Sequence, residues 1–178
     1  MPTTTNSTIQ RGGEWLLQPP GSAIFTREHL TEEHRLIAQT AVAFVENEVL
    51  PVLERLEDKD WNLARRLLQR CGELGLLGID VSEAYGGVGL DKVSSMLVSE
   101  SLSRAASFAA TFGAQTNLAS LALFLFGSEP QKQAYLPRLV SGELVGAYAL
   151  SETSSGSDAL GARTRAVRQS DGSFRISG

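Results

Sequence analysis

The residues best suited to chemistry are the hydroxyl-bearing ones between Tyr148 and Asp158, where the sequence reads YALSETSSGSD. The apolar run just before them predicts that a buried strand, residues 144–150, leads into a loop. Backbone N–H groups and serine hydroxyls that converge in such a loop can bind an anionic or strongly accepting ligand. Gly156 allows the positive φ that a concave backbone often needs. The residues alone also fit a polar connecting loop whose serines cap local backbone groups.

Two carboxylates, Glu152 and Asp158, lie in this segment and raise the question of acid–base catalysis. Nothing nearby in the sequence supplies a partner that would tune them, and loop carboxylates are usually solvated. The stretch 155–157 lacks the outer glycines of a serine-hydrolase elbow. Both histidines, His29 and His34, fall at the start of the first predicted helix, where we expect surface positions. The sequence therefore indicates no catalytic residue.

Charge and cysteine content exclude several classes of site. The 178 residues carry a formal net charge of −4, which argues against nucleic-acid binding because duplex affinity comes mainly from Lys and Arg. One cysteine cannot form an internal disulfide, and one thiol with two histidines does not make a familiar zinc site, so no metal is expected. Cys71 lies in an apolar helical stretch and is interpreted as a buried core residue, which fits a reducing compartment.

The distribution of apolar residues indicates a soluble protein. The chain does not open with the basic and apolar pattern of a secretory signal. Its most apolar run, Leu118–Phe126, is much shorter than the ~20 residues that span a bilayer. We therefore expect a cytoplasmic protein with no transmembrane segment.

The elements that must position the loop divide the chain into three predicted parts. Residues 1–26 are interpreted as a flexible leader, residues 27–143 as a helical domain, and residues 144–178 as the first strands of an incomplete β domain. The fold class expected is thus mainly α, an N-terminal all-helical bundle followed by the truncated start of a β domain. Strands are predicted at 164–168 and 173–176 with a turn between them.

Apolar residues at spacings of three and four define the helices. Thr31 is the predicted N-cap of the first, and Pro51 is expected to kink or break it. Ser128 begins a capping box for the last, which ends near Val140. The stretch 105–126 carries almost no charge, so we expect it to be buried nearly all round at the bundle centre. The arginines near residues 65–70 are more simply a solvated helix face than a phosphate site.

At this point the chain resembles the acyl-CoA dehydrogenase family. Leu150-Ser151-Glu152 followed by Ser155-Gly156-Ser157-Asp158 is similar to that family's signature segment. The likeness covers about residues 30–178 and is greatest for the long-chain and very-long-chain branch. Further matching stretches occur in the family's order and spacing: Tyr85-Gly86-Gly87-Val88-Gly89-Leu90, Phe126-Gly127, Gln131-Lys132, Tyr135-Leu136-Pro137 and Ser141-Gly142-Glu143.

The resemblance implies a helical N-terminal domain, a middle β-barrel domain and a C-terminal helical bundle, with FAD bound between the last two. It places the flavin-binding residues in the strand and loop discussed above, and it places Gly156 and Ser157 near the FAD phosphates and the pantetheine arm of the thioester. Ser151 stands where threonine is commoner, and Thr153 replaces a usual proline, which loosens the turn. The implied cofactor-binding residues are Tyr148, Ala149, Leu150, Ser151, Glu152, Gly156 and Ser157.

The reaction that the resemblance implies is α,β-dehydrogenation of an acyl-CoA in fatty acid β-oxidation, with electrons passed to an electron-transfer flavoprotein and a homo-oligomeric full-length enzyme. The family's glutamate base lies in the C-terminal domain, beyond this chain. The implied substrate-binding residues are Ser157 and Ala114. Ala114 falls where medium-chain relatives carry a bulky polar group at the end of the acyl pocket, so a long acyl chain is expected.

Two alternatives remain at this point. One is a non-catalytic helical module that binds acyl-CoA or another protein, because the chain offers no base and only part of an FAD site. The other is a flavin oxidase or monooxygenase on the same scaffold, which oxygen reactivity would distinguish. We also expect the 178-residue chain alone to lack dehydrogenase activity and not to retain FAD.

Overall fold

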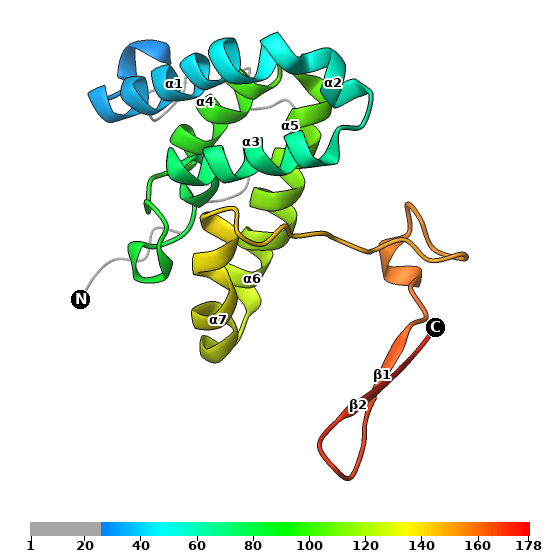
Figure 1. The fold of residues 1–178 in the computed structure, drawn as a ribbon. Helices are drawn as coiled ribbons and strands as arrows, with labels where there is room; N and C mark the ends of the chain where they lie inside the picture. Colours follow the sequence, from blue (N-terminus) through cyan, green and yellow to red (C-terminus); the bar gives the residue numbers. More distant parts are fainter. Residues whose placement is uncertain (1–25) are drawn as a thin grey trace, which may run out of the picture.

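The computed structural model describes residues 26–178, and it confirms a mainly helical fold followed by a short β segment (Figure 1). Most of the predicted leader, residues 1–25, lies outside the described residues. The single-turn 3₁₀ helices are Arg27–His29 (η2), Leu50–Val52 (η4), Leu76–Gly78 (η5), Glu83–Tyr85 (η6) and Ala159–Gly161 (η8). The longer elements are α1 (Glu32–Phe44), π-helix η3 (Val45–Val49), α2 (Leu53–Glu57), α3 (Trp61–Glu73), α4 (Lys92–Leu102), α5 (Ala106–Gly113), π-helix η7 (Ala114–Ser120), α6 (Leu121–Phe126), α7 (Glu129–Val140), β1 (Arg165–Arg168) and β2 (Phe174–Ser177).

The predicted helix boundaries are confirmed. Thr31 caps α1 by accepting a hydrogen bond from the backbone N–H of His34, and Ser128 begins the capping box of α7. The helix that starts at Glu32 loses its regular pattern before Pro51, first as a π-turn and then as a 3₁₀ turn. A proline inside a helix removes a backbone donor and crowds the preceding turn, which explains the break.

A large apolar core joins α1, α3, α4 and α5. Its buried side chains include Phe44, Leu68, Cys71, Leu102 and Phe108, all at most 2% exposed. Cys71 is the predicted core residue, and burial raises the pKa of its thiol far above the usual range. A smaller cluster around Val81, Leu136 and Val140 holds α7 against the turn that follows η5.

The stretch 105–126 is less buried than its composition predicts. It forms one continuous helix, α5–η7–α6, and its N-terminal half enters the core through Phe108 and Phe112. Leu118, Leu125 and Phe126 remain exposed, the last at 86%. The expectation of burial all round is therefore wrong for this chain, because the helix reaches past the neighbours that cover its first half (Figure 1).

Among residues 26–178, two helical stretches are long and apolar enough to cross a membrane by length and composition alone, Glu32–Glu57 and Ala106–Phe126. They meet in the core, where the rings of Phe44 and Phe108 have centroids 6.0 Å apart. Core helices of soluble proteins pass the same test of composition. Packing in the core of the bundle therefore explains why the buried residues of these two stretches are apolar.

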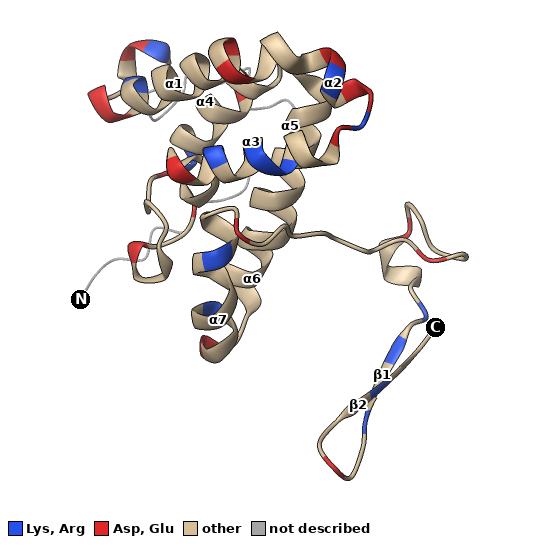
Figure 2. Ribbon diagram, in the orientation of Figure 1, with Lys and Arg blue, Asp and Glu red and all other residues tan. Residues whose placement is uncertain are grey.

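Arg positions cluster along α3 (Figure 2), and their side chains contact neighbouring parts of the fold. Arg70 pairs with Glu48 at 3.0 Å and with Glu73 at 2.8 Å. The guanidinium of Arg65 donates to the backbone carbonyl of Glu143 at 3.3 Å. Two of the three clustered arginines thus have partners within the fold. Arg65 and Arg66 are also exposed, as expected for a solvated helix face.

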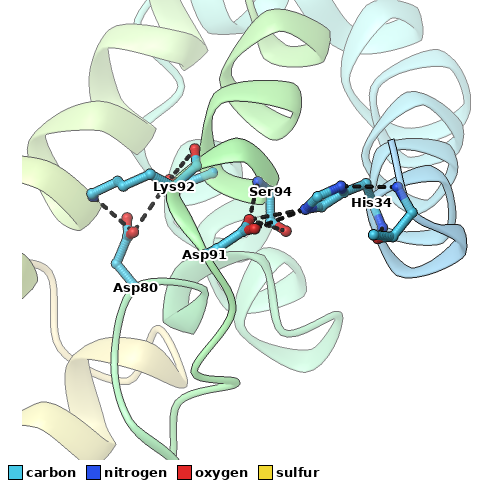
Figure 3. Close-up of polar contacts among 7 residues, drawn as sticks. His34, Asp80, Asp91, Lys92 and Ser94 are labelled. Carbon is cyan, nitrogen blue, oxygen red and sulfur yellow. Dashed lines mark hydrogen bonds and ion pairs between the residues drawn. The ribbon is translucent and has the colours of Figure 1, made fainter. Parts of the chain in front are cut away.

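His34 connects the start of α1 to the start of α4 (Figure 3). Its Nδ1 accepts the backbone N–H of Thr31 at 3.1 Å, so the ring proton must be on Nε2. Nε2 then donates to the carboxylate of Asp91 at 2.9 Å, and Asp91 also accepts the N–H of Ser94 as the N-cap of α4. The expected surface position of His34 is wrong, because its residue is only 5% exposed.

Replacing His34 by alanine is expected to lower the free energy of unfolding by about 1–3 kcal/mol, because it removes a cap acceptor and a buried hydrogen bond. Urea unfolding followed by circular dichroism would measure the loss. Gln39→Ala is the control, since Gln39 is exposed on the same helix and its side chain has no hydrogen-bond partner among the described residues, so its replacement should change stability by about 0.5 kcal/mol or less. Equal effects of the two substitutions would contradict this role of His34.

Candidate functional site

The segment predicted as a buried strand, residues 144–150, is extended but pairs with no strand within residues 26–178. Residues 147–150 are exposed, and only Leu144 and Gly146 are half-buried. The strand prediction is therefore wrong for this chain. An apolar run becomes a strand only when a neighbouring strand satisfies its backbone groups, and the only sheet among the described residues is the β1–β2 hairpin further along the chain.

Gln115 attaches the beginning of this segment to the helical domain. Its side-chain amide donates to the carbonyl oxygens of Leu139 at 2.8 Å and Leu144 at 2.9 Å, and its Oε1 accepts the backbone N–H of Gly146 at 2.6 Å. Gln115 is 1% exposed and lies in the π-helix η7. Gln115 was not among the residues predicted from the sequence. The available signal was a long amide in an apolar helix, since a buried polar group requires partners.

Gly146 has a steric role at this contact. A Cβ at position 146 would overlap the Cβ of Ala119 on the same long helix. The small side chain of Ala119 and the absence of one at Gly146 let the backbone approach the helix closely enough for the hydrogen bond to Gln115. The segment therefore leaves the bundle from a defined point.

After this attachment point, the backbone N–H groups are available as hydrogen-bond donors. Among the described residues, the N–H groups of residues 147–151 and the hydroxyl of Ser151 have no hydrogen-bond partner. Tyr148 and Leu150 are 54% and 42% exposed. A run of unpaired N–H groups next to exposed aromatic and aliphatic side chains is suited to a planar ligand that accepts hydrogen bonds.

The loop that follows is closed on itself. Glu152 and Ser155 exchange backbone hydrogen bonds of 2.8 and 3.1 Å, and the hydroxyl of the buried Ser155 donates to the carbonyl of Asp158. The Glu152 carboxylate accepts the backbone N–H groups of Arg163 at 2.7 Å and Thr164 at 3.0 Å. Glu152 thus braces the loop through its backbone and its carboxylate.

The other predicted residues of the loop have different surroundings. Gly156 does not take the positive φ that its type allows, and a Cβ there would meet no atom within 4 Å. In a binding site, Gly156 would therefore contribute backbone groups that a ligand can approach closely, and no unusual backbone conformation. Ser157 is exposed and its hydroxyl has no partner among the described residues.

Ala114 lies far from the loop in sequence but next to Gln115, the residue that attaches the extended segment. Ala114 and Gln115 are the first two residues of the π-helix η7. Ala114 is half-buried. The extended segment after α7, which carries Ser157, runs away from the helical bundle that contains Ala114 (Figure 1), so the described residues do not bring the two into one cavity.

Bracing by Glu152 should be pH-dependent. Hydrogen bonds from Thr164 and from the N–H of Arg163 lower the pKa of this carboxyl below its ordinary value. A lowered folded-state pKa means that the contribution is present above the unfolded-state value and disappears as the pH falls through the folded-state value. We expect the amide resonances of Arg163 and Thr164 to shift only as the pH falls below the ordinary pKa of a glutamate carboxyl. Glu152→Gln should abolish that titration, and an unchanged titration in the variant would contradict the assignment.

No group of three potential metal-ligating side chains occurs within residues 26–178. What these residues define is a helical bundle followed by an attached, extended segment with unpaired backbone N–H groups. Residues 31–143 match the family model for the acyl-CoA dehydrogenase N-terminal domain. The chain belongs to the acyl-CoA dehydrogenase family.

Individual relatives agree with this assignment. The chain is 48% identical over 169 residues to a probable acyl-CoA dehydrogenase of Bacillus subtilis, and the match covers 94% of this chain and 28% of the relative. It is 33% identical to the mitochondrial isovaleryl-CoA dehydrogenase of Pongo abelii, over 95% of this chain and 43% of that protein. A crystal structure of acyl-CoA dehydrogenase complexed with FAD from Bacillus anthracis matches with a TM-score of 0.83 and 52% identity, over 87% of this chain and 27% of that one. The chain therefore spans less than half the length of each of these relatives.

Proposed function

We propose that a full-length protein carrying this sequence catalyses FAD-dependent α,β-dehydrogenation of an acyl-CoA thioester. The observation that carries the proposal is the segment 147–151, whose unpaired N–H groups and free Ser151 hydroxyl lie between two fixed points, Gln115 and Glu152. Family membership gives this segment its chemical context.

The donor set fits a flavin. An isoalloxazine ring presents carbonyl oxygens and ring nitrogens at its edge, and such acceptors pair with backbone N–H and hydroxyl donors. Residues Tyr148 to Glu152 would hold the ring edge, and the open backbone at Gly156 with the Ser157 hydroxyl would approach phosphate or pantetheine groups. When bound, FAD supplies the acceptor for the hydrogen removed from the acyl chain. This chain's residues contribute orientation of cofactor and thioester, and they contribute no base.

We propose further that the helical part spans residues 27–143 and that residues 144–178 begin a β domain. The last helix ends at Val140, and the β1–β2 hairpin is exposed on both faces, as strands that await further partners would be. Electron-transfer flavoprotein as the electron acceptor, a homo-oligomeric assembly and a cytoplasmic location belong to the same proposal. The buried thiol of Cys71 is compatible with a reducing compartment.

We propose a long acyl chain as the substrate. Ala114 and the neighbouring Gly113 have little or no side chain at this point of the continuous helix α5–η7–α6. A bulky polar side chain at position 114 would shorten an acyl pocket that ended there. The proposal concerns only chain length and stands apart from the dehydrogenation itself.

The experiment is anaerobic reduction of the FAD of the full-length protein by saturated acyl-CoA thioesters, followed by loss of the flavin absorbance near 450 nm. We expect bleaching, with C14–C18 thioesters preferred over C4–C6 ones. Ala114→Glu should reverse this preference while C4 reduction persists. Bleaching with a C4–C6 preference in the unaltered protein would overturn the length proposal alone, whereas no bleaching by any thioester would overturn the proposed reaction. The 178-residue chain by itself is expected to purify colourless.

A further inference from the structure

A pocket of about 270 Å³ lies between the α2–α3 connection and α5. Figure 1 shows this connection running beside the N-terminal half of α5. None of its residues is used in the proposed dehydrogenation. Apolar and polar side chains both line it: Leu56, Glu57, Lys59, Trp61, Ala64, Ser107, Phe108 and Thr111.

Ser107 supplies a buried hydroxyl that has no hydrogen-bond partner within residues 26–178. Other helical serines here donate back to a carbonyl four residues earlier, as Ser99 does to Ser95 at 2.9 Å and Ser101 does to Leu97 at 3.0 Å. Ser107 lies in the first turn of α5, so its hydroxyl lacks that partner. A buried polar atom without a partner indicates a site that a ligand or water completes.

Lys59 supplies a cation from an unusual backbone position. It is the only non-glycine residue among those described with a positive φ, 65°. The N–H of Lys59 donates to the carbonyl of Leu56, and the N–H of Asp60 donates to the carbonyl of Arg55, both at 3.0 Å. These two bonds form the C-terminal cap of α2, in which the position of Lys59 favours glycine. The Lys59 ammonium has no ion-pair or hydrogen-bond partner among the described residues.

The rim of the pocket is rigid and aromatic. Asp60 caps α3 through the N–H of Leu63 at 3.0 Å and pairs with Arg55 at 2.7 Å, so the connection is held in place. Trp61, the next residue, is 70% exposed. A large aromatic ring left in solvent beside a pocket is typical of a binding surface.

The charges select the kind of head group. Lys59 and the Ser107 hydroxyl favour an anion that accepts hydrogen bonds. Glu57 is the one carboxylate of the lining, and its repulsion disfavours a doubly charged head group such as a phosphate monoester. Leu56, Phe108 and Trp61 provide the surface for an apolar chain. From this combination we infer that the pocket binds a monocarboxylate with an aliphatic chain, its head at Lys59 and Ser107.

Trp61 makes the inference testable in the 178-residue chain. The chain has two tryptophans, Trp15 and Trp61, so Trp15→Phe leaves Trp61 as the reporter. Octanoate is expected to change its fluorescence saturably. Lys59→Gln and Ser107→Ala should each weaken binding about tenfold or more, while Lys132→Gln, a lysine that lies over the ring of Phe124, should leave it unchanged.

Three probes of equal chain length separate the outcomes. 1-Octanol and octyl phosphate should bind at least about tenfold more weakly than octanoate if the pocket selects a single negative charge. Equal binding of octanol, or octanoate binding that Lys59→Gln and Ser107→Ala leave unaltered, would overturn the inference. A change in Trp61 fluorescence that does not saturate with octanoate would also overturn the inference, because the pocket would then hold only water. Circular dichroism of both variants verifies that they fold, and octylamine provides a cationic control that should not bind.

Discussion

Replacing Gln115 by leucine is expected to lower the free energy of unfolding by about 2–4 kcal/mol, because an unpaired buried polar group costs about 1–3 kcal/mol. The substitution keeps the volume of the side chain but removes all three hydrogen bonds of the amide. The carbonyl of Leu144 and the N–H of Gly146 would each lose their partner, whereas the carbonyl of Leu139 would still accept the N–H of Gly142.

The same substitution should also free the extended segment after α7, residues 144–151, from the helix that holds it. Without Gln115, the backbone of residues 144–146 has no side-chain anchor on the central helix, so the hydrogen exchange of the Gly146 amide should accelerate by at least about tenfold. Urea unfolding and exchange followed by NMR measure the two effects separately. In the full-length protein, FAD affinity should fall in parallel, because the segment would no longer be held ready for the cofactor.

Asn117→Leu is the matched control, because Asn117 lies on the same π-helix but is exposed. It should change stability by about 0.5 kcal/mol or less and leave the exchange of Gly146 unaltered. If Gln115→Leu behaved like Asn117→Leu, the segment would have to be anchored by contacts other than the amide.

A second large effect is expected for Gly72→Ala, which should lower the free energy of unfolding by roughly 2–4 kcal/mol. Gly72 is in α3, where the chain after α7 passes directly over it. A Cβ there would overlap the carbonyl of Ser141 and lie 2.9 Å from its Cα. Backbone atoms cannot move aside as a flexible side chain does, so α3 and the end of α7 would have to separate.

Gly113→Ala separates this steric effect from helix propensity. Gly113 is also helical, and a Cβ there meets only the side-chain amide of Asn117, at 4.0 Å. Alanine is the better helix former, so this change should raise stability by about 0.5–1 kcal/mol. Thermal unfolding of both variants tests the pair. A stabilising Gly72→Ala would show that α3 and the residue after α7 are not in close contact.

Local signals in the sequence predicted most of the helical fold. Thr31 and Ser128 cap their helices through side chains within three residues, and Pro51 disturbs the turn that contains it. The turn at residues 170–172 joins β1 and β2, with Gly172 at a φ of 85°. Each feature depends on residues close together in the chain, so its physics is visible in a short window of sequence.

The errors arose where distant segments decide the outcome. His34 is buried because the N-cap of α4, 57 residues later, reaches its ring. The expected strand at 144–150 has no neighbouring strand in the part of the chain that the structure describes. Leu118, Leu125 and Phe126 are apolar but exposed, because burial depends on what else packs against the helix. Composition reports the tendency of a residue to be buried and does not supply the partner.

The sequence by itself determined the helix boundaries, the hairpin and the family, because caps, proline breaks, turns and motif order are properties of neighbouring residues. Only the tertiary structure decided how the candidate site is held and where a second ligand could bind. Gln115 meets Gly146 across 31 residues, Glu152 braces Arg163 and Thr164, and Lys59 meets Ser107 in one pocket. Such contacts form when helices pack and bring unsatisfied polar groups together, and no local sequence pattern records that juxtaposition.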